Sequence, residues 1–93
     1  MPVHITGRLI CRDEAEARIV RSHIAEHIRL TRAEPGCIAF DVVPALNDPL
    51  VWMLDESFRD AAAFEAHRIR IAASEWGRVS RGITRDFRVT EKP

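Results

Sequence analysis

Hydrophobic residues recur along this chain with two different periods, and the periods predict its secondary structure. Over residues 3–11 and again over 83–90, apolar and polar residues alternate with a period of two, which is typical of strands. Residues 37–44 and 50–57 are rich in apolar and β-branched residues and are predicted to be two more strands. Asn47, Asp48 and Pro49 supply the turn between them, so these two strands are predicted to form a hairpin.

Two helices are predicted between the strands. Asp13 is a suitable cap for the first, Pro35-Gly36 ends it, and one side carries residues at helical spacing: Ala17, Val20, Ile24, Ile28 and Thr31. Asp60 caps the second, whose alanines are strong helix formers, and Gly77 or Gly82 marks its end. In this second helix Phe64, His67 and Ile71 share one stripe, which we expect to face the core.

The resulting order, β-α-β-β-α-β, predicts an α+β fold of the ferredoxin-like type with a four-stranded antiparallel sheet. Residues 1–93 form a single domain in this interpretation, with the first and last strands in or beside the middle of the sheet. A neighbouring strand then separates the strands of Cys11 and Cys37. Two strand spacings of about 4.8 Å exceed the roughly 7 Å limit for bridged Cα atoms, so no disulfide is expected within a subunit.

The strands at 37–44 and 50–57 carry apolar residues on both faces, such as Phe40 and Val43, or Trp52 and Met53. Helices cover only one face in this topology, and a solvated face would alternate with charges. We therefore expect a second copy to cover the other face, giving a homodimer in which two sheets form a barrel. The alternative is ordinary exposed hydrophobic residues.

Composition excludes several classes of function. The 14 basic and 14 acidic residues balance, so no basic surface indicates nucleic-acid binding. The apolar runs are too short for a membrane span, and no signal-peptide pattern opens the chain. Two cysteines fit a reducing compartment better than a disulfide framework. These features predict a cytoplasmic protein without nucleic-acid or membrane partners.

The segments TRAEPGCIAFDV (31–42), DP (48–49) and LDESFRDAAAFEAH (54–67) resemble the antibiotic biosynthesis monooxygenase family, which includes quinol monooxygenases. The resemblance covers nearly the whole chain. The matching residues are Thr31-Arg32, Glu34-Pro35-Gly36-Cys37, Phe40-Asp41-Val42, Glu56, Phe58, Asp60 and Phe64-Glu65-Ala66-His67. The resemblance implies a homodimeric α/β barrel with a pocket between sheet and helices in each subunit.

Some members of that family oxygenate aromatic polyketides or hydroquinones without metal, flavin or heme. The resemblance thus implies a monooxygenase that needs no cofactor and takes a small aromatic substrate and molecular oxygen. Heme-degrading relatives use a histidine where this chain has Gly77, so heme ligation is not implied. After His67 the sequence RIRIAASEWGR replaces a shorter polar stretch found in many members, and the resemblance therefore does not define the substrate class.

His67 is the best candidate for a catalytic base, since electron-rich phenolates react with oxygen and an unperturbed histidine has a pKa near 6.5. Burial should lower that pKa unless a carboxylate opposes it. The alternative is a structural histidine bonded to a carboxylate such as Glu56 or to a backbone carbonyl. Glu56 and Asp41 are candidates to orient His67 or contact substrate; alternatively, they cap turns or pair with arginines.

Other candidates for substrate contact are Phe64, His27, Trp52, Trp76 and Arg85. The tryptophans either stack on a flat substrate or belong to the core or the dimer contact. Arg85 either binds a phenolate or carboxylate or pairs with Asp55, Glu56 or Asp86. His27 is a pocket group or a core residue. His23 and His27 are one turn apart, as in some metal sites, but no third ligand is near in sequence, so we predict no metal site.

Three functions from different classes are compatible with the sequence. The first is the cofactor-independent monooxygenase. The second is a dimeric binding or stress-response protein that uses the same pocket without chemistry. The third is an isomerase that transfers protons through a single base. Fold does not decide among them.

Overall fold

The computed structural model describes residues 1–91, in seven elements. They are β1 (Val3–Ile10), α1 (Glu14–Arg32), β2 (Cys37–Pro44), β3 (Val51–Phe58), α2 (Ala61–Ala72), α3 (Glu75–Val79) and β4 (Thr84–Glu91). Each predicted strand and helix is present and starts within one to two residues of its predicted start. The one difference is that the second predicted helix is divided into α2 and α3. No helix within residues 1–91 is both long and apolar enough to cross a membrane.

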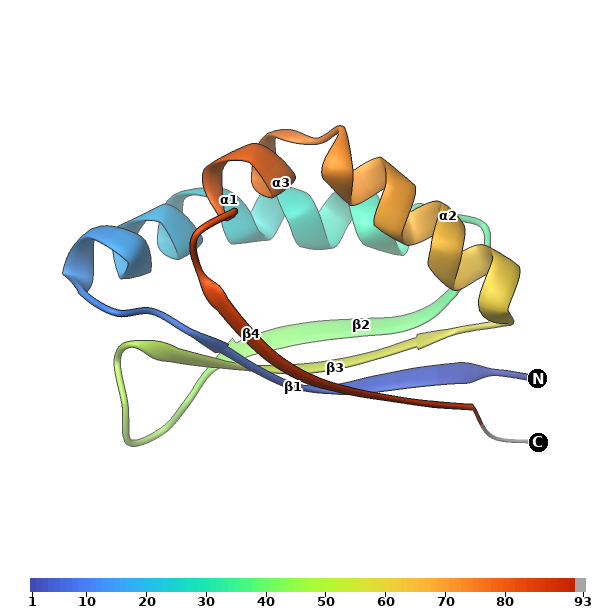
Figure 1. Cartoon of the computed structure of the whole chain (residues 1–93), viewed down its shortest axis with the longest axis horizontal. Helices are drawn as coiled ribbons and strands as arrows, with labels where there is room; N and C mark the ends of the chain where they lie inside the picture. Colours follow the sequence, from blue (N-terminus) through green and yellow to red (C-terminus); the bar gives the residue numbers. More distant parts are fainter. Residues whose placement is uncertain (92–93) are drawn as a thin grey trace.

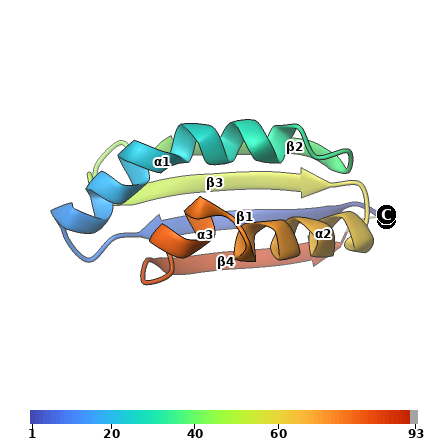
Figure 2. The same cartoon turned by 90° about the horizontal axis from the view of Figure 1, so that it is seen from above.

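The four strands form one antiparallel sheet in the order β2-β3-β1-β4, which confirms the ferredoxin-like prediction. β1 is central, and β4 lies beside it at the edge, as Figure 2 shows from above. β3 separates β1 from β2, so the strand order behind the disulfide argument is confirmed. Both cysteines are free thiols.

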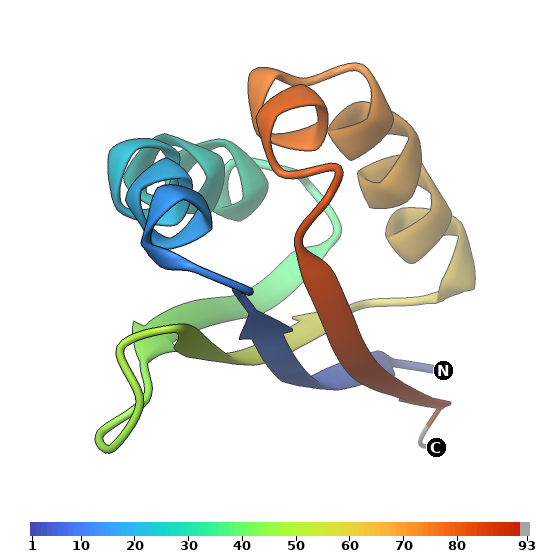
Figure 3. The same ribbon diagram turned by 60° about the vertical axis from the view of Figure 1, so that its left-hand side comes forward.

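All the helices lie on one face of the sheet (Figure 1). α1 lies over β2 and β3, whereas α2 and α3 lie over β1 and β4 (Figure 2), and the two sets of helices are separate in the oblique view of Figure 3. The predicted stripe of α1 faces the sheet: Ala17, Val20 and Thr31 are buried, and Ile24 and Ile28 pack against the core. The largest fully buried side chains, Phe40 and Phe58, come from β2 and β3.

The second helix ends earlier than predicted, and a short helix follows it. Ser74 causes the division, because its Oγ donates to the carbonyl of Ile71 and accepts the N–H of Gly77. This hydroxyl therefore ends α2 and caps α3 at once. A Cβ at Gly77 would lie 2.0 Å from the Ile71 carbonyl oxygen, so only glycine permits this close turn. The turn brings Trp76 over α1.

The outer face of the sheet is less apolar than predicted. Val43 and Met53 are exposed there, at 53% and 44%. Ion pairs join the same face: His4 with Asp55 at 2.9 Å, and Arg8 with Asp86 at 2.6 Å. A bulge between Cys37 and Ala39 also moves Ile38 to an exposed position. Apolar and charged side chains thus share this face.

Candidate active site

His67 lies on the core-facing side of α2, as its stripe with Phe64 and Ile71 predicts. Asp60 begins the helix by accepting the N–H of Ala63 at 2.8 Å. His67 then lies on the side that faces the sheet, where its side chain is 2% exposed. Its ring lies 4.7 Å from the ring of Phe58 and 6.5 Å from that of Phe64, measured between centroids. The imidazole is therefore enclosed by aromatic rings rather than by water.

The carboxylate bonded to His67 is Glu34, not the predicted Glu56. The Nδ1 atom lies 3.0 Å from Oε2 of Glu34, in the segment between α1 and β2. Arg70, one turn after His67, donates to the same Glu34 carboxylate and to Thr31 Oγ1 at 2.8 Å. The guanidinium thus holds the carboxylate that holds the imidazole. The sequence pointed to Glu34 only as part of the family motif, because Glu34 is 33 positions before His67 and no local pattern links the two residues.

The bond to Glu34 assigns the imidazole proton. A carboxylate accepts hydrogen bonds, so Nδ1 donates to it and Nε2 keeps its lone pair. Burial lowers the pKa of His67, and the hydrogen bond from Nδ1 to Glu34 opposes this only in part. The expected fall in pKa is therefore confirmed. At neutral pH His67 is an uncharged imidazole with Nε2 available to accept a proton.

Glu56 lies on the other side of the imidazole, near the end of β3. Its Oε1 is 3.9 Å from Nε2 of His67, and the residue is 4% exposed. Burial, followed by the charges of Glu34 and Asp55, raises the pKa of Glu56 to about 8. The side chain is therefore a neutral carboxylic acid at pH 7, which can donate a proton. A base and an acid thus adjoin within one buried site.

Two spaces that share several lining residues lie beside this pair, on the helix side of the sheet. An outer pocket of about 390 Å³ is lined by Glu56, Phe64, His67 and Arg85 among the predicted residues. An inner recess of about 40 Å³ is lined by His27 and Trp76, and again by Glu56, His67 and Arg85. The structure therefore brings six of the eight predicted site residues together.

His27 forms the wall of the inner recess on α1. Its ring stacks on Trp76 at 5.2 Å and meets Phe40 edge-on at 5.3 Å. It is 4% exposed, and burial, assisted by the positive charge of Arg70, lowers its pKa to about 3. Its Nδ1 is buried without a hydrogen-bond partner in residues 1–91. His27 is therefore a neutral group in an aromatic environment.

His23 does not share a site with His27, because its Nδ1 bonds back to the Ile19 carbonyl at 3.0 Å. Within the described part of the chain, no three histidine, cysteine, aspartate or glutamate residues group closely enough to hold a metal ion.

Arg85 reaches the pocket from β4 and has no carboxylate partner within residues 1–91. Its guanidinium donates to the Ser80 carbonyl at 3.0 Å, the Ser80 hydroxyl at 2.7 Å and the Ile83 carbonyl at 3.1 Å. The alternative of an ion pair with Asp55, Glu56 or Asp86 is wrong. Asp86 pairs with Arg8 instead, on the opposite face.

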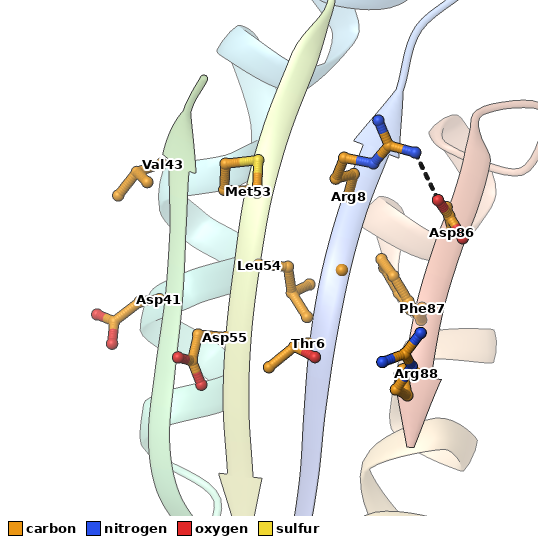
Figure 4. A pocket seen from close by; sticks show the side chains of 11 residues that line it. Thr6, Arg8, Asp41, Val43, Met53, Leu54, Asp55, Asp86, Phe87 and Arg88 are labelled. Carbon is orange, nitrogen blue, oxygen red and sulfur yellow. Dashed lines mark hydrogen bonds and ion pairs between the residues drawn. The ribbon is translucent and has the colours of Figure 1, made fainter. Parts of the chain in front are cut away.

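Two predicted residues lie apart from the pocket. Asp41 is on the outer face of β2, where it pairs with Arg32 at 3.0 Å. It borders a groove of about 700 Å³ that crosses the outer face, shown in Figure 4 with Val43, Met53 and the Arg8–Asp86 ion pair. Trp52 is buried in the core, where β3 pairs with β1 opposite Leu9. Neither residue contacts His67 in this arrangement, and Trp52 matches the core alternative.

Comparisons with solved structures identify many proteins of the same fold. A Mycobacterium tuberculosis protein is 26% identical, with a TM-score of 0.72, covering 100% of this chain and 95% of its own. A Deinococcus radiodurans protein is 20% identical with a TM-score of 0.75, covering 100% and 93%. A structure named antibiotic biosynthesis monooxygenase is 24% identical with a TM-score of 0.69, covering 97% and 94%.

No curated protein matches the chain. The sequence profile of the family described as "Antibiotic biosynthesis monooxygenase" matches residues 2–76, which include β1, both strands of the hairpin, and the Glu34, Glu56 and His67 side chains. This match covers most of the chain and agrees with the ferredoxin-like sheet, so the protein belongs to the antibiotic biosynthesis monooxygenase family.

Proposed function

We propose that the protein is a cofactor-independent monooxygenase that acts on a quinol-like or polyketide-like aromatic molecule. The observation that supports this most strongly is the Glu34–His67 pair beside a mainly apolar pocket. A carboxylate that holds Nδ1–H leaves Nε2 as the proton acceptor and stabilises the imidazolium that forms. In this proposal His67 is the general base, and Glu34 is the positioning residue.

The proposed reaction begins when Nε2 of His67 accepts the proton of a phenol bound in the pocket. The phenolate or its carbanion form is electron-rich enough to pass one electron to oxygen, and the two radicals then combine. Where a ring CH₂ becomes a carbonyl, the substrate loses four electrons. One oxygen atom remains in the product, and the other leaves as water with the two hydrogens from that carbon.

The protein's contribution is a dry site, orientation and two proton carriers. Phe64 and the aromatic wall around His67 limit the access of water to the base. Glu56, which is neutral at pH 7 because its pKa is raised to about 8, supplies the proton that the departing oxygen requires. Trp76 and His27 close the inner end of the site.

We also propose that two copies associate through the outer face of the sheet, which would complete the α/β barrel. The exposed Val43 and Met53, and the groove they border, support this proposal. Met53→Glu would place an unpaired charge in that interface. Sedimentation velocity should then detect monomers in the variant and dimers in the unchanged protein, and a monomeric unchanged protein at micromolar concentration would overturn the proposal.

A second candidate function is proton transfer without oxygen. The proximity of the neutral acid Glu56 to Nε2 of His67, at 3.9 Å, favours it, because a base can remove a proton from one carbon while a neighbouring acid donates one to another. This candidate predicts exchange of solvent deuterium into a substrate under anaerobic conditions. Ligand binding without oxygen uptake or exchange would instead support the non-catalytic binding protein.

The decisive experiment measures oxygen uptake with a panel of hydroquinones and phenolic polyketides. His67→Gln, which removes the base but retains a polar side chain of similar size, should lower the rate by about 10²–10⁴-fold. Glu34→Gln should lower it by about 10²-fold or more, because an amide can donate to Nδ1 and move the proton to Nε2. His23→Gln, outside the pocket, is the matched control. Unchanged uptake in the His67 variant would remove this residue from the mechanism.

A further inference from the structure

Three arginines line the outer pocket, from three different segments. Arg68 comes from α2, Arg81 from the connection between α3 and β4, and Arg85 from β4. Arg81 forms no ion pair within residues 1–91, and Arg85 bonds only to neutral acceptors. Arg68 has one exposed partner, Glu65, at 3.4 Å. The chain as a whole carries no net charge, so this pocket concentrates positive charge that is balanced elsewhere.

Three hydrogen bonds orient the Arg85 guanidinium at the pocket. The Ser80 hydroxyl that accepts from it is completely buried and itself donates to the carbonyl of Trp76. A guanidinium has five N–H donors, and the three bonds to Ser80 and Ile83 occupy three of them. Two donors remain without a partner in the described chain. A fixed guanidinium with donors to spare is the arrangement that binds a carboxylate.

The remainder of the pocket is apolar and carries no opposing charge at neutral pH. Glu56 is the one acidic side chain in its lining, and burial keeps it protonated, with a pKa of about 8. Phe64, Ile71 and Val89 supply apolar surface. The volume of about 390 Å³ lies near the lower end of the range for ligand pockets. Charge, shape and size together select a compact anion with an apolar body.

We propose that this pocket binds a compact aromatic carboxylate, with the carboxylate against Arg85 and Arg81 and the ring directed past Phe64 toward His67. This inference rests on the proposed function for the identity of the site and adds its substrate class. The anionic group lies at the arginine end, and the hydroxyl that loses a proton lies at the His67 end. A neutral quinol of the same size would lack the first contact.

The test is calorimetric titration of the full chain with two ligands of equal ring size, naphthoate and naphthol. Neither ligand needs to react, so binding is measured apart from turnover. Naphthoate should bind about 10- to 100-fold more tightly than naphthol, the ratio expected for one or two charge-assisted hydrogen bonds. Added KCl should weaken naphthoate binding and leave naphthol binding unchanged. Equal or tighter binding of naphthol, or no binding of either ligand, would overturn the inference.

Variants locate the contact. Arg81 is exposed and forms no ion pair within residues 1–91, so the Arg81→Gln variant should fold normally and bind naphthoate several-fold more weakly. Arg85→Gln should lower it by about 10- to 100-fold with little effect on naphthol. Arg88→Gln is the matched control, because Arg88 belongs to the same strand but borders the groove on the outer face (Figure 4). If Arg81→Gln, with its fold checked by circular dichroism, retains full naphthoate affinity, the assignment is wrong.

The proposed carboxylate binding and the proposed oxygenation can be refuted independently of each other. Selective binding of naphthoate with no oxygen uptake on any hydroxylated aromatic would refute the oxygenation and retain this inference. Oxygen uptake on neutral hydroquinones with weak naphthoate binding would do the reverse.

Discussion

The Glu56→Gln substitution changes the free energy of unfolding by an amount that depends on pH. Relative to the unchanged chain, this change should favour the folded state more at alkaline pH than at acid pH. Glu56 is buried, and its pKa is raised from 4.5 to about 8 in the folded protein. The folded state therefore binds a proton that the unfolded chain releases above pH 4.5. Stability is lost as the pH rises from 4.5 through 8, because folding then requires that this proton be taken up. Glutamine retains the size and polarity but does not titrate.

The magnitude follows from the two pKa values. Near pH 5 the penalty is below about 1 kcal/mol, because this pH lies only about half a unit above the pKa of the unfolded carboxyl. Near pH 8 the penalty approaches about 4 kcal/mol, since roughly three pKa units of about 1.4 kcal/mol each separate the two states. The difference between the two conditions is about 3–4 kcal/mol. This is a large share of the 5–15 kcal/mol typical of a small domain.

Urea denaturation at both pH values, at one fixed protein concentration, measures this difference. The quantity of interest is the change in unfolding free energy caused by Glu56→Gln near pH 8, minus the same change near pH 5. Packing effects of the amide and the titration of other groups cancel in this subtraction. A difference near zero would mean that Glu56 is ionised in the folded protein, and it would remove the neutral acid from the site.

Three further outcomes are expected. Because burial lowers the pKa of His27 to about 3, the folded protein should lose stability as the pH falls below about 6.5. In acid titrations followed by circular dichroism, His27→Phe should reduce that loss. An equal loss in the variant would contradict the burial argument. Gly36→Ala should destabilise by about 1–3 kcal/mol in urea, because a Cβ there would lie 2.3 Å from the Ala63 Cβ, and adding Ala63→Gly should restore part of the loss. Thiol titration of the denatured, unreduced protein should find both Cys11 and Cys37 free; a single bridge per chain would contradict the strand order.

The local sequence determined the elements and the face that each presents. Period-two alternation located β1 and β4, and the stripe of Phe64, His67 and Ile71 placed the histidine on the buried side of α2. These features depend on contacts within a few residues, where propensity and periodicity act directly. The break after Ala72 was missed because Ser74 can continue a helix or cap a new one, and its hydroxyl bonds decide which.

Only the tertiary structure decided which side chains meet. Glu34 bonds to His67 from 33 positions away, and no periodicity connects the end of α1 to the middle of α2. Arg85 bonds to Ser80 rather than to an acid, and Asp41 lies on the far face of the sheet, because strand order and register set these distances. The raised pKa of Glu56 has the same origin. A sequence specifies that a carboxyl is present, but the free energy of its charge depends on how much water the folded chain removes from around it.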